Sequence, residues 1–94
     1  MTPLSDEEIE QRLASADGWD RGEEDSIVRE LSFADFAAAI AFVNRVADAA
    51  EAANHHPDIL LHGWNKVRLE LSTHSADGLT EADFELAGQI DRLV

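Results

Sequence analysis

One local pattern occurs three times along the chain and indicates where its helices begin. Each copy joins a leucine, a serine or threonine, an acidic residue three positions later and then an apolar residue. The hydroxyl group accepts a hydrogen bond from a backbone N–H in the first turn of a helix, and the acidic side chain accepts one from the backbone N–H of the capping residue. The two apolar residues pack against each other. The copies are "LSDEEI", "LSFADF" and "LTEADF", with Ser5, Ser32 and Thr80 as caps and Glu8, Asp35 and Asp83 as acidic partners. They predict helices over about residues 5–15, 33–54 and 80–93.

Segments typical of strands lie between these helices. Residues 27 to 31 follow a turn-forming "GEED" stretch and predict a strand, with residues 19 to 21 as its candidate hairpin partner. After Pro57, "DILLHGW" is a short strand candidate. The segment "KVRLELSTH" alternates between two faces, with Val67, Leu69, Leu71 and Thr73 on one and Arg68, Glu70, Ser72 and His74 on the other. The order α-β-β-α-β-β-α indicates an α+β fold, a four-stranded antiparallel sheet with three helices packed on one face.

Length and charge narrow the classes of function. A chain of 94 residues is most simply a single domain, residues 1–94, with one core. Its formal net charge of −13 repels phosphate backbones, so no direct nucleic-acid binding is expected. No apolar run approaches the roughly 20 residues of a membrane span, and the acidic N-terminus is unlike a signal peptide. The absence of cysteine excludes disulfides and fits a reducing cytoplasm.

The long central helix has the composition of an association surface. Its predicted core stripe is Phe36, Ile40, Val43, Ala47 and Ala50. Alanine occupies ten of residues 34–53, which leaves the other faces of the helix smooth enough for close packing. A small domain with a free sheet edge and such a helix often completes its burial by self-association, so we expect a homodimer or homotetramer.

The stretch "EAANHHPDILLHGW" places His55 and His56 together at the predicted end of that helix. Pro57 prevents the helix from continuing. The negative end of the helix dipole favours an imidazolium there, which suits a proton donor, although a simple electrostatic cap is the alternative interpretation. Glu51 lies one helical turn before His55 and is a candidate partner for it.

Three other residues need a role. His74 ends the alternating strand and is either an exposed strand-end residue or part of a site. Asp83 belongs to a capping box, yet a carboxylate there can also accept a hydrogen bond from an imidazole and fix its tautomer. His62 is expected to be a surface or structural residue. A metal site is not favoured, because adjacent helical residues diverge by about 100° and no His-x-x-x-His motif is present.

Together these positions resemble the pterin-4a-carbinolamine dehydratase family. Its pattern of an acidic residue, His-His-Pro, an aromatic residue, a histidine and an aspartate is matched by Glu51, His55, His56, Pro57, Trp64, His74 and Asp83. The likeness includes "GW" at 18–19 and "FADFAAAIAFVNRVADAAE", and so covers nearly the whole chain. Six residues, "DILLHG", precede Trp64 where many members have five before a tyrosine. The additional residue would alter the strand register or force a bulge.

The resemblance implies a dehydratase that converts 4a-hydroxytetrahydropterin to quinonoid dihydropterin in tetrahydropterin recycling, with no cofactor and no metal. Its catalytic residues would be His55, His56 and His74. His55 and His74 would be the general acid and base, His56 would bind and orient the pterin, and Asp83 would anchor His74 or its loop. The pterin would contact His55, His56, Pro57, Trp64, His74 and Asp83. Two alternatives stay open. One is a dehydratase-like protein with altered or lost pterin turnover. The other is a helix-mediated dimerisation or regulatory module, since one family member also serves a homeodomain transcription factor.

Overall fold

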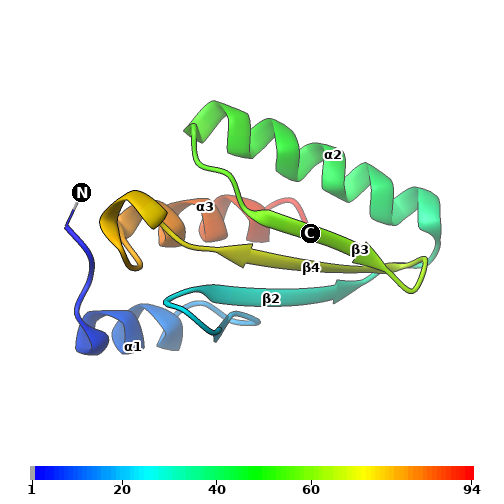
Figure 1. Ribbon diagram of the computed structural model, residues 1–94. Coiled ribbons are helices and arrows are strands. Elements are labelled where there is room, and N and C mark those ends of the chain that lie inside the picture. The colour runs from blue at the N-terminus through cyan, green and yellow to red at the C-terminus, as the bar shows by residue number, and fades with distance from the viewer. Residues whose placement is uncertain (1) are drawn as a thin grey trace.

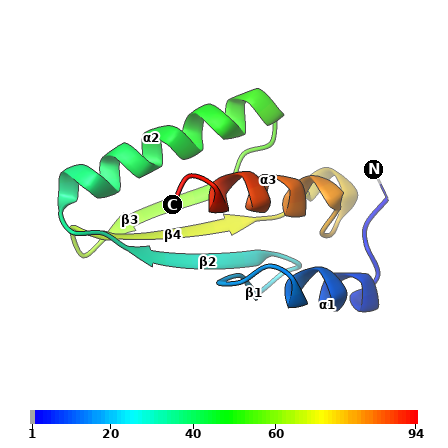
Figure 2. The same ribbon diagram turned by 180° about the vertical axis from the view of Figure 1, so that it is seen from behind.

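A four-stranded antiparallel sheet with three helices on one face forms the protein (Figures 1 and 2). This is a computed structural model, and it describes residues 2–94. The helices are α1 (Asp6–Ala14), α2 (Phe36–Ala53) and α3 (Glu81–Asp91), and the strands are β1 (Asp20–Arg21), β2 (Ile27–Ser32), β3 (Asp58–His62) and β4 (Lys66–Leu71). A short 3-10 helix, His74–Ala76, lies between β4 and α3. The predicted fold class and element order are confirmed. None of the helices within the described residues is long and apolar enough to cross a membrane.

Two of the three predicted capping boxes are present. At α1, the Glu8 amide donates to Ser5 Oγ at 3.2 Å, and the Ser5 amide donates to Glu8 Oε1 at 3.0 Å. At α3, Thr80 is the N-cap, and its backbone N–H donates to Asp83 Oδ2 at 2.9 Å. Both helices therefore begin where the local sequence predicts.

The prediction for the second helix start is wrong. Ser32 is not a cap but the last residue of β2, where it pairs with Lys66 of β4. Asp35 is the N-cap instead, and its Oδ1 accepts from the Ala38 amide at 2.7 Å. The ladder between β2 and β4 extends the strand through Ser32, so pairing with a distant segment decides the conformation of a residue that the local code assigns to a helix.

The buried stripe of α2 also differs from the prediction. Ala39, Phe42, Val46 and Ala50 form it, and only Ala50 belongs to the predicted stripe. Phe36 and Ile40 are instead 52% and 38% exposed. Two apolar stripes overlap on this helix. The one with Phe42 is buried, because that ring packs against Phe33 with the centroids 5.0 Å apart.

The strand order β1-β2-β4-β3 makes β4 central and leaves β3 at an edge. The alternation of β4 is confirmed, since Val67, Leu69 and Leu71 are fully buried under the helices. The β3–β4 register is continuous from the Asp58–Glu70 pair to the His62–Lys66 pair, so the expected bulge is absent.

The three residues between His62 and Lys66 form the connecting turn. Gly63 and Trp64 there adopt left-handed φ values of 56° and 60°. The β3–β4 register is thus regular up to this turn. This turn lies at one end of the β3–β4 hairpin, whereas the end of α2 and the 3-10 helix lie at the other (Figure 1).

Candidate active site

The end of α2 brings His55 to α3. Asn54 follows the helix in the left-handed conformation, with φ 49°, and the His55 amide donates to Ala50 O at 3.1 Å. The predicted position of the histidine pair at a helix end is confirmed. The ring of His55 is largely buried, and its Nε2 lies 2.6 Å from Asp83 Oδ1.

Asp83 is fully buried and receives several donors. Besides the Thr80 amide, Thr73 Oγ1 donates to Asp83 Oδ2 at 2.8 Å. An ionised carboxylate only accepts hydrogen bonds, and two donors on Oδ2 suit that form. Nε2 of His55 then carries the proton that faces Oδ1, and Nδ1 is the ring nitrogen left for other chemistry. One carboxylate thus serves both the helix cap and the imidazole.

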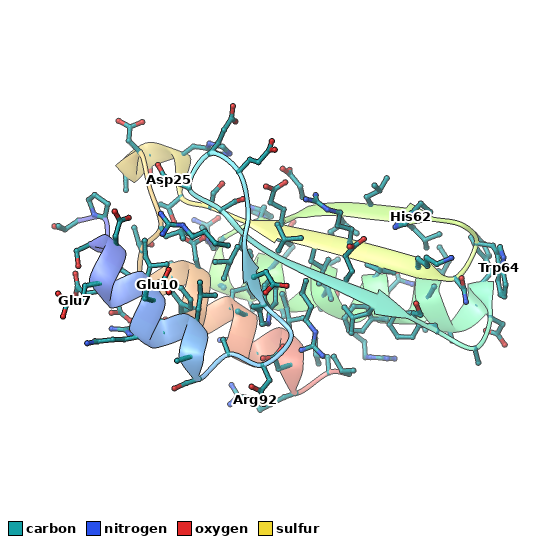
Figure 3. All side chains as sticks on the ribbon, turned by 90° about the horizontal axis from the view of Figure 1, so that it is seen from below. Glu7, Glu10, Asp25, His62, Trp64 and Arg92 are labelled. Atoms are coloured by element: carbon teal, nitrogen blue, oxygen red, sulfur yellow. The ribbon has the colours of Figure 1, made fainter. Side chains whose placement is uncertain are left out.

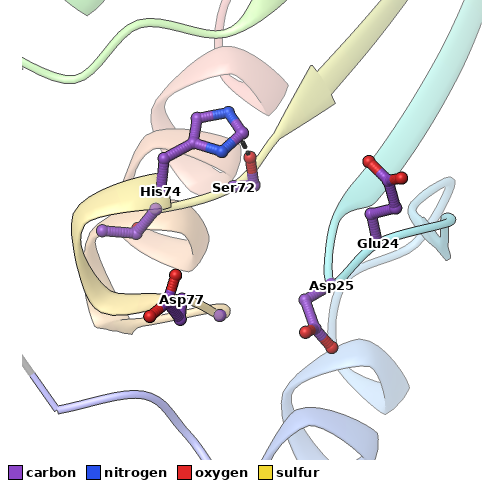
Figure 4. Close-up of a pocket in the computed structure, with 7 residues that line it drawn as sticks. Glu24, Asp25, Ser72, His74 and Asp77 are labelled. Atoms are coloured by element: carbon purple, nitrogen blue, oxygen red, sulfur yellow. Dashed lines mark hydrogen bonds between the residues drawn. The ribbon is translucent and has the colours of Figure 1, made fainter.

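His74 lies beyond the end of β4 and begins the 3-10 helix. It is exposed, and its Nε2 lies 3.3 Å from Ser72 Oγ (Figure 4). The sequence placed it at the end of the strand, but the regular strand ends at Leu71 and a single bridge joins Thr73 to Gly78. Asp83 reaches this loop through Thr73 and not through the imidazole of His74.

A pocket of about 320 Å³ opens beside His74. Ser72, His74 and Asp77 lie on one side of it, and Glu24 and Asp25 of the β1–β2 turn lie on the other (Figure 4). Its volume is at the lower end of the range for small-molecule sites, roughly 300–1,000 Å³.

Sequence reasoning missed Glu24, Asp25 and Asp77 as pocket residues. Glu24 and Asp25 belong to the "GEED" segment, which the sequence predicts as a turn, and Asp77 lies in "SADGL", which follows His74. Nothing local indicates that the two loops meet, because the sheet brings them together: β1 and β2 form a hairpin, and β2 pairs with β4.

His56 and Pro57 complete the doublet segment. His56 is 58% exposed at its side chain, and its Nε2 lies 3.6 Å from Glu51 Oε2. The expected pair between Glu51 and His55 is therefore not formed, because His55 turns toward Asp83. Pro57 is the residue before β3.

The fold of one chain separates two other residues from this cluster. His62 ends β3 with its Nε2 3.9 Å from Glu30 Oε1, which fits the expected structural role. Trp64 is 62% exposed in the next turn, and Figure 3 shows it at the opposite end of the molecule from Asp25 of the pocket. The five residues of β3 span about 17 Å. A single chain therefore does not bring Trp64 to His55 and His74 as the sequence predicted.

The fold and this cluster define a small α+β protein with a histidine pair after its central helix, a buried aspartate behind it and a third histidine after the last strand. The chain belongs to the Pterin 4 alpha carbinolamine dehydratase family, whose model matches residues 2–93.

Relatives and solved structures agree with this family. A protein of Acidobacterium capsulatum with the provisional name pterin-4-alpha-carbinolamine dehydratase is 50% identical over 94 residues and covers all of both chains. One of Chloroflexus aurantiacus with the same provisional name is 52% identical over 94 residues, covering 100% of this chain and 99% of its own. A crystal structure from Brucella melitensis, described as a transcriptional coactivator/pterin dehydratase, has a TM-score of 0.92, 32% identity and 98% coverage of each chain.

A more distant structure shares the fold alone. It is described as a pterin dehydratase-like protein that is a RuBisCO assembly factor in the alpha-carboxysome. Its TM-score is 0.68 at 24% identity, and the match covers 81% of this chain and 88% of that one.

Proposed function

We propose that this protein dehydrates 4a-hydroxytetrahydropterin to quinonoid dihydropterin and water, as a step of tetrahydropterin recycling. Family membership supports the reaction class. The observation that carries the proposal is the His55–Asp83 contact of 2.6 Å, made beside the loop that holds His74. An imidazole oriented by a buried carboxylate is a common form of acid–base catalyst.

The reaction needs one proton to be delivered to the departing hydroxyl and one proton to be removed from a ring nitrogen. The C4a–O bond breaks, and the departing hydroxyl leaves as water once an acid protonates it. The adjacent ring nitrogen gives its proton to a base, and the electrons of its N–H bond form the C=N double bond. No net oxidation occurs, so two imidazoles, one as acid and one as base, suffice for the proton transfers.

The residues divide these tasks by their positions. His55 and His74 are the proposed acid–base pair, with Nδ1 of His55 as its working nitrogen, because Nε2 faces Asp83. The exposed ring of His56 binds and orients the pterin, and Pro57 shapes the segment that presents both adjacent rings. The pocket beside His74, which His55 and His56 do not line, is proposed as the part of the substrate space on the His74 side.

The test follows the absorbance decay of 4a-hydroxytetrahydropterin, generated in solution, with and without the purified protein. The wild type should accelerate the decay, and the His55→Ala/His74→Ala double variant should lose on the order of 10²-fold or more in kcat. His62→Ala is the matched control and should behave as the wild type. Equal losses in both variants would refute the site assignment. No acceleration by a folded wild type would refute the proposed reaction.

A second role is supported by a separate surface. Phe36 and Ile40 of α2 are exposed, as is Ile59 of the edge strand β3, which lies on the helix side of the sheet opposite buried Leu69. The long helix and the unpaired strand thus present apolar side chains that a monomer leaves in water. We propose that this surface, here named the α2–β3 surface, holds copies of the chain together as a dimer or tetramer. The same surface is where a helix-mediated regulatory role would act.

A further inference from the structure

We propose that Thr73 is a positioning residue for the reaction, and that its buried hydroxyl holds one carboxylate against both catalytic segments. The proposal rests on the proposed function, which supplies the roles of His55 and His74. Within the described residues, Thr73 makes no hydrogen bond to the imidazole of His55 or His74. It acts through Asp83.

The donor and the acceptor of each hydrogen bond at the Thr73 hydroxyl can be assigned. Its Oγ1 lies 2.8 Å from Asp83 Oδ2 and 2.9 Å from Thr80 Oγ1. Ionised Asp83 has no proton to donate, so the Thr73 hydroxyl donates to it. The Thr80 hydroxyl then donates to Thr73. All three residues are at most 7% exposed, so water does not compete for these contacts.

The backbone of Thr73 holds the loop of His74. Its carbonyl accepts from the Ala76 amide at 3.0 Å and from the Gly78 amide at 3.4 Å. These bonds close the 3-10 turn that begins at His74. Thr73 therefore fixes the segment of one histidine with its main chain and the carboxylate partner of the other with its side chain.

Removal of the hydroxyl has a specific consequence. Asp83 Oδ2 would keep only the Thr80 amide as a donor, and Oδ1 would keep only His55. The carboxylate would then be free to rotate relative to its two remaining donors, and the His55 ring would rotate with it. Valine has a methyl group in place of the threonine hydroxyl, so Thr73→Val removes this hydrogen bond with only a small change in side-chain shape.

Three variants separate positioning from packing. Thr73→Val lacks the hydroxyl, Thr73→Ser restores it, and Thr80→Val removes the neighbouring buried hydroxyl, which makes no hydrogen bond to the carboxylate of Asp83 within the described residues. For each, kcat and KM are measured in the dehydration assay, and the tautomer and nitrogen shifts of His55 are read from long-range proton–nitrogen spectra of isotope-labelled protein. The spectra need no turnover, so they test Thr73 even where the dehydratase proposal fails.

We expect Thr73→Val to lower kcat on the order of 10-fold with little change in KM, and to shift the His55 nitrogens. Thr73→Ser should restore both, and Thr80→Val should leave the His55 nitrogens in place. Unchanged His55 signals in folded Thr73→Val would overturn the proposal, as would equal effects of Thr73→Val and Thr80→Val. If Thr73→Val does not fold, the wild type and Thr73→Ser decide. Both must show His55 protonated at Nε2, and a proton at Nδ1 alone in either overturns the proposal.

Discussion

Asp83 concentrates two requirements in one buried side chain. As the third residue of α3 it caps the Thr80 amide, and through its other oxygen it holds His55. A cap needs only an acceptor, whereas an imidazole that must stay oriented and accept charge benefits from an anion. Substitutions at this position therefore separate stability from catalysis.

Asp83→Ala should lower both stability and activity. The loss of the cap and of the acceptor for Thr73 is expected to reduce the free energy of unfolding by about 2–4 kcal/mol. Thermal unfolding followed by circular dichroism measures this change. Asp83→Asn keeps a cap acceptor and the side-chain volume but not the charge, so it should lose less stability for a similar loss of kcat. An Asp83→Ala variant with the melting temperature of the wild type would contradict the capping role.

Among the helices and strands, the sequence predicts the features that depend on neighbouring residues and mispredicts those that depend on distant ones. The capping boxes at Ser5 and Thr80 were predictable because each is complete within four residues. Ser32 was mispredicted, because its conformation depends on a strand that begins more than 30 residues later. The buried stripe of α2 was mispredicted because alanine satisfies either of two overlapping stripes. Only the tertiary packing of Phe42 on Phe33 selects between them.

The candidate site shows the same limit. The residues of the His-His-Pro segment and their place at a helix end followed from local rules. The partner of His55 did not, since a separation of 28 residues lies beyond any helical or strand period. Trp64 is assigned to the site only by the family resemblance, and the β3–β4 hairpin places it at the far end of the molecule.

An ion pair between elements gives a prediction for acid conditions. Arg12 of α1 and Glu81 of α3 form a two-point contact, and the hydrogen bond from Arg12 lowers the pKa of Glu81 below its ordinary value of 4.5. A carboxyl with a lowered pKa stabilises the fold fully above its ordinary pKa, and this contribution is lost as the pH falls through the lower folded value.

Glu81→Gln should therefore reduce the acid sensitivity of the fold. Between the wild type and this variant, the difference in free energy of unfolding should be largest near neutral pH and shrink as the pH falls below 4.5. Urea unfolding at a series of pH values measures it. Glu85→Gln, an exposed position on the same helix with no ion pair in the described residues, is the control. A difference that grows toward acid pH would contradict the expected sign.

At the scale of the whole molecule, the two ends of the sheet have different chemistry. His55 and His56 lie where α2 finishes and β3 begins, and His74 follows β4 at the same end of the sheet, whereas Trp64 lies at the opposite end (Figures 1 and 3). Association through the α2–β3 surface would cover apolar side chains and leave the pocket lined by the β1–β2 turn open. Self-association and catalysis are thus compatible in one assembly.

Ile40→Glu and Ile59→Glu test this arrangement from its two elements. Each puts a charge where we expect another copy to pack, so both should shift the protein to a smaller species in analytical ultracentrifugation at micromolar concentration. Ala14→Glu adds the same charge at an exposed position of α1 and should leave the mass unchanged. A monomeric wild type would refute self-association. A wild-type oligomer that survives both substitutions would place the interface elsewhere, because burial of either new carboxylate costs more than such a contact supplies.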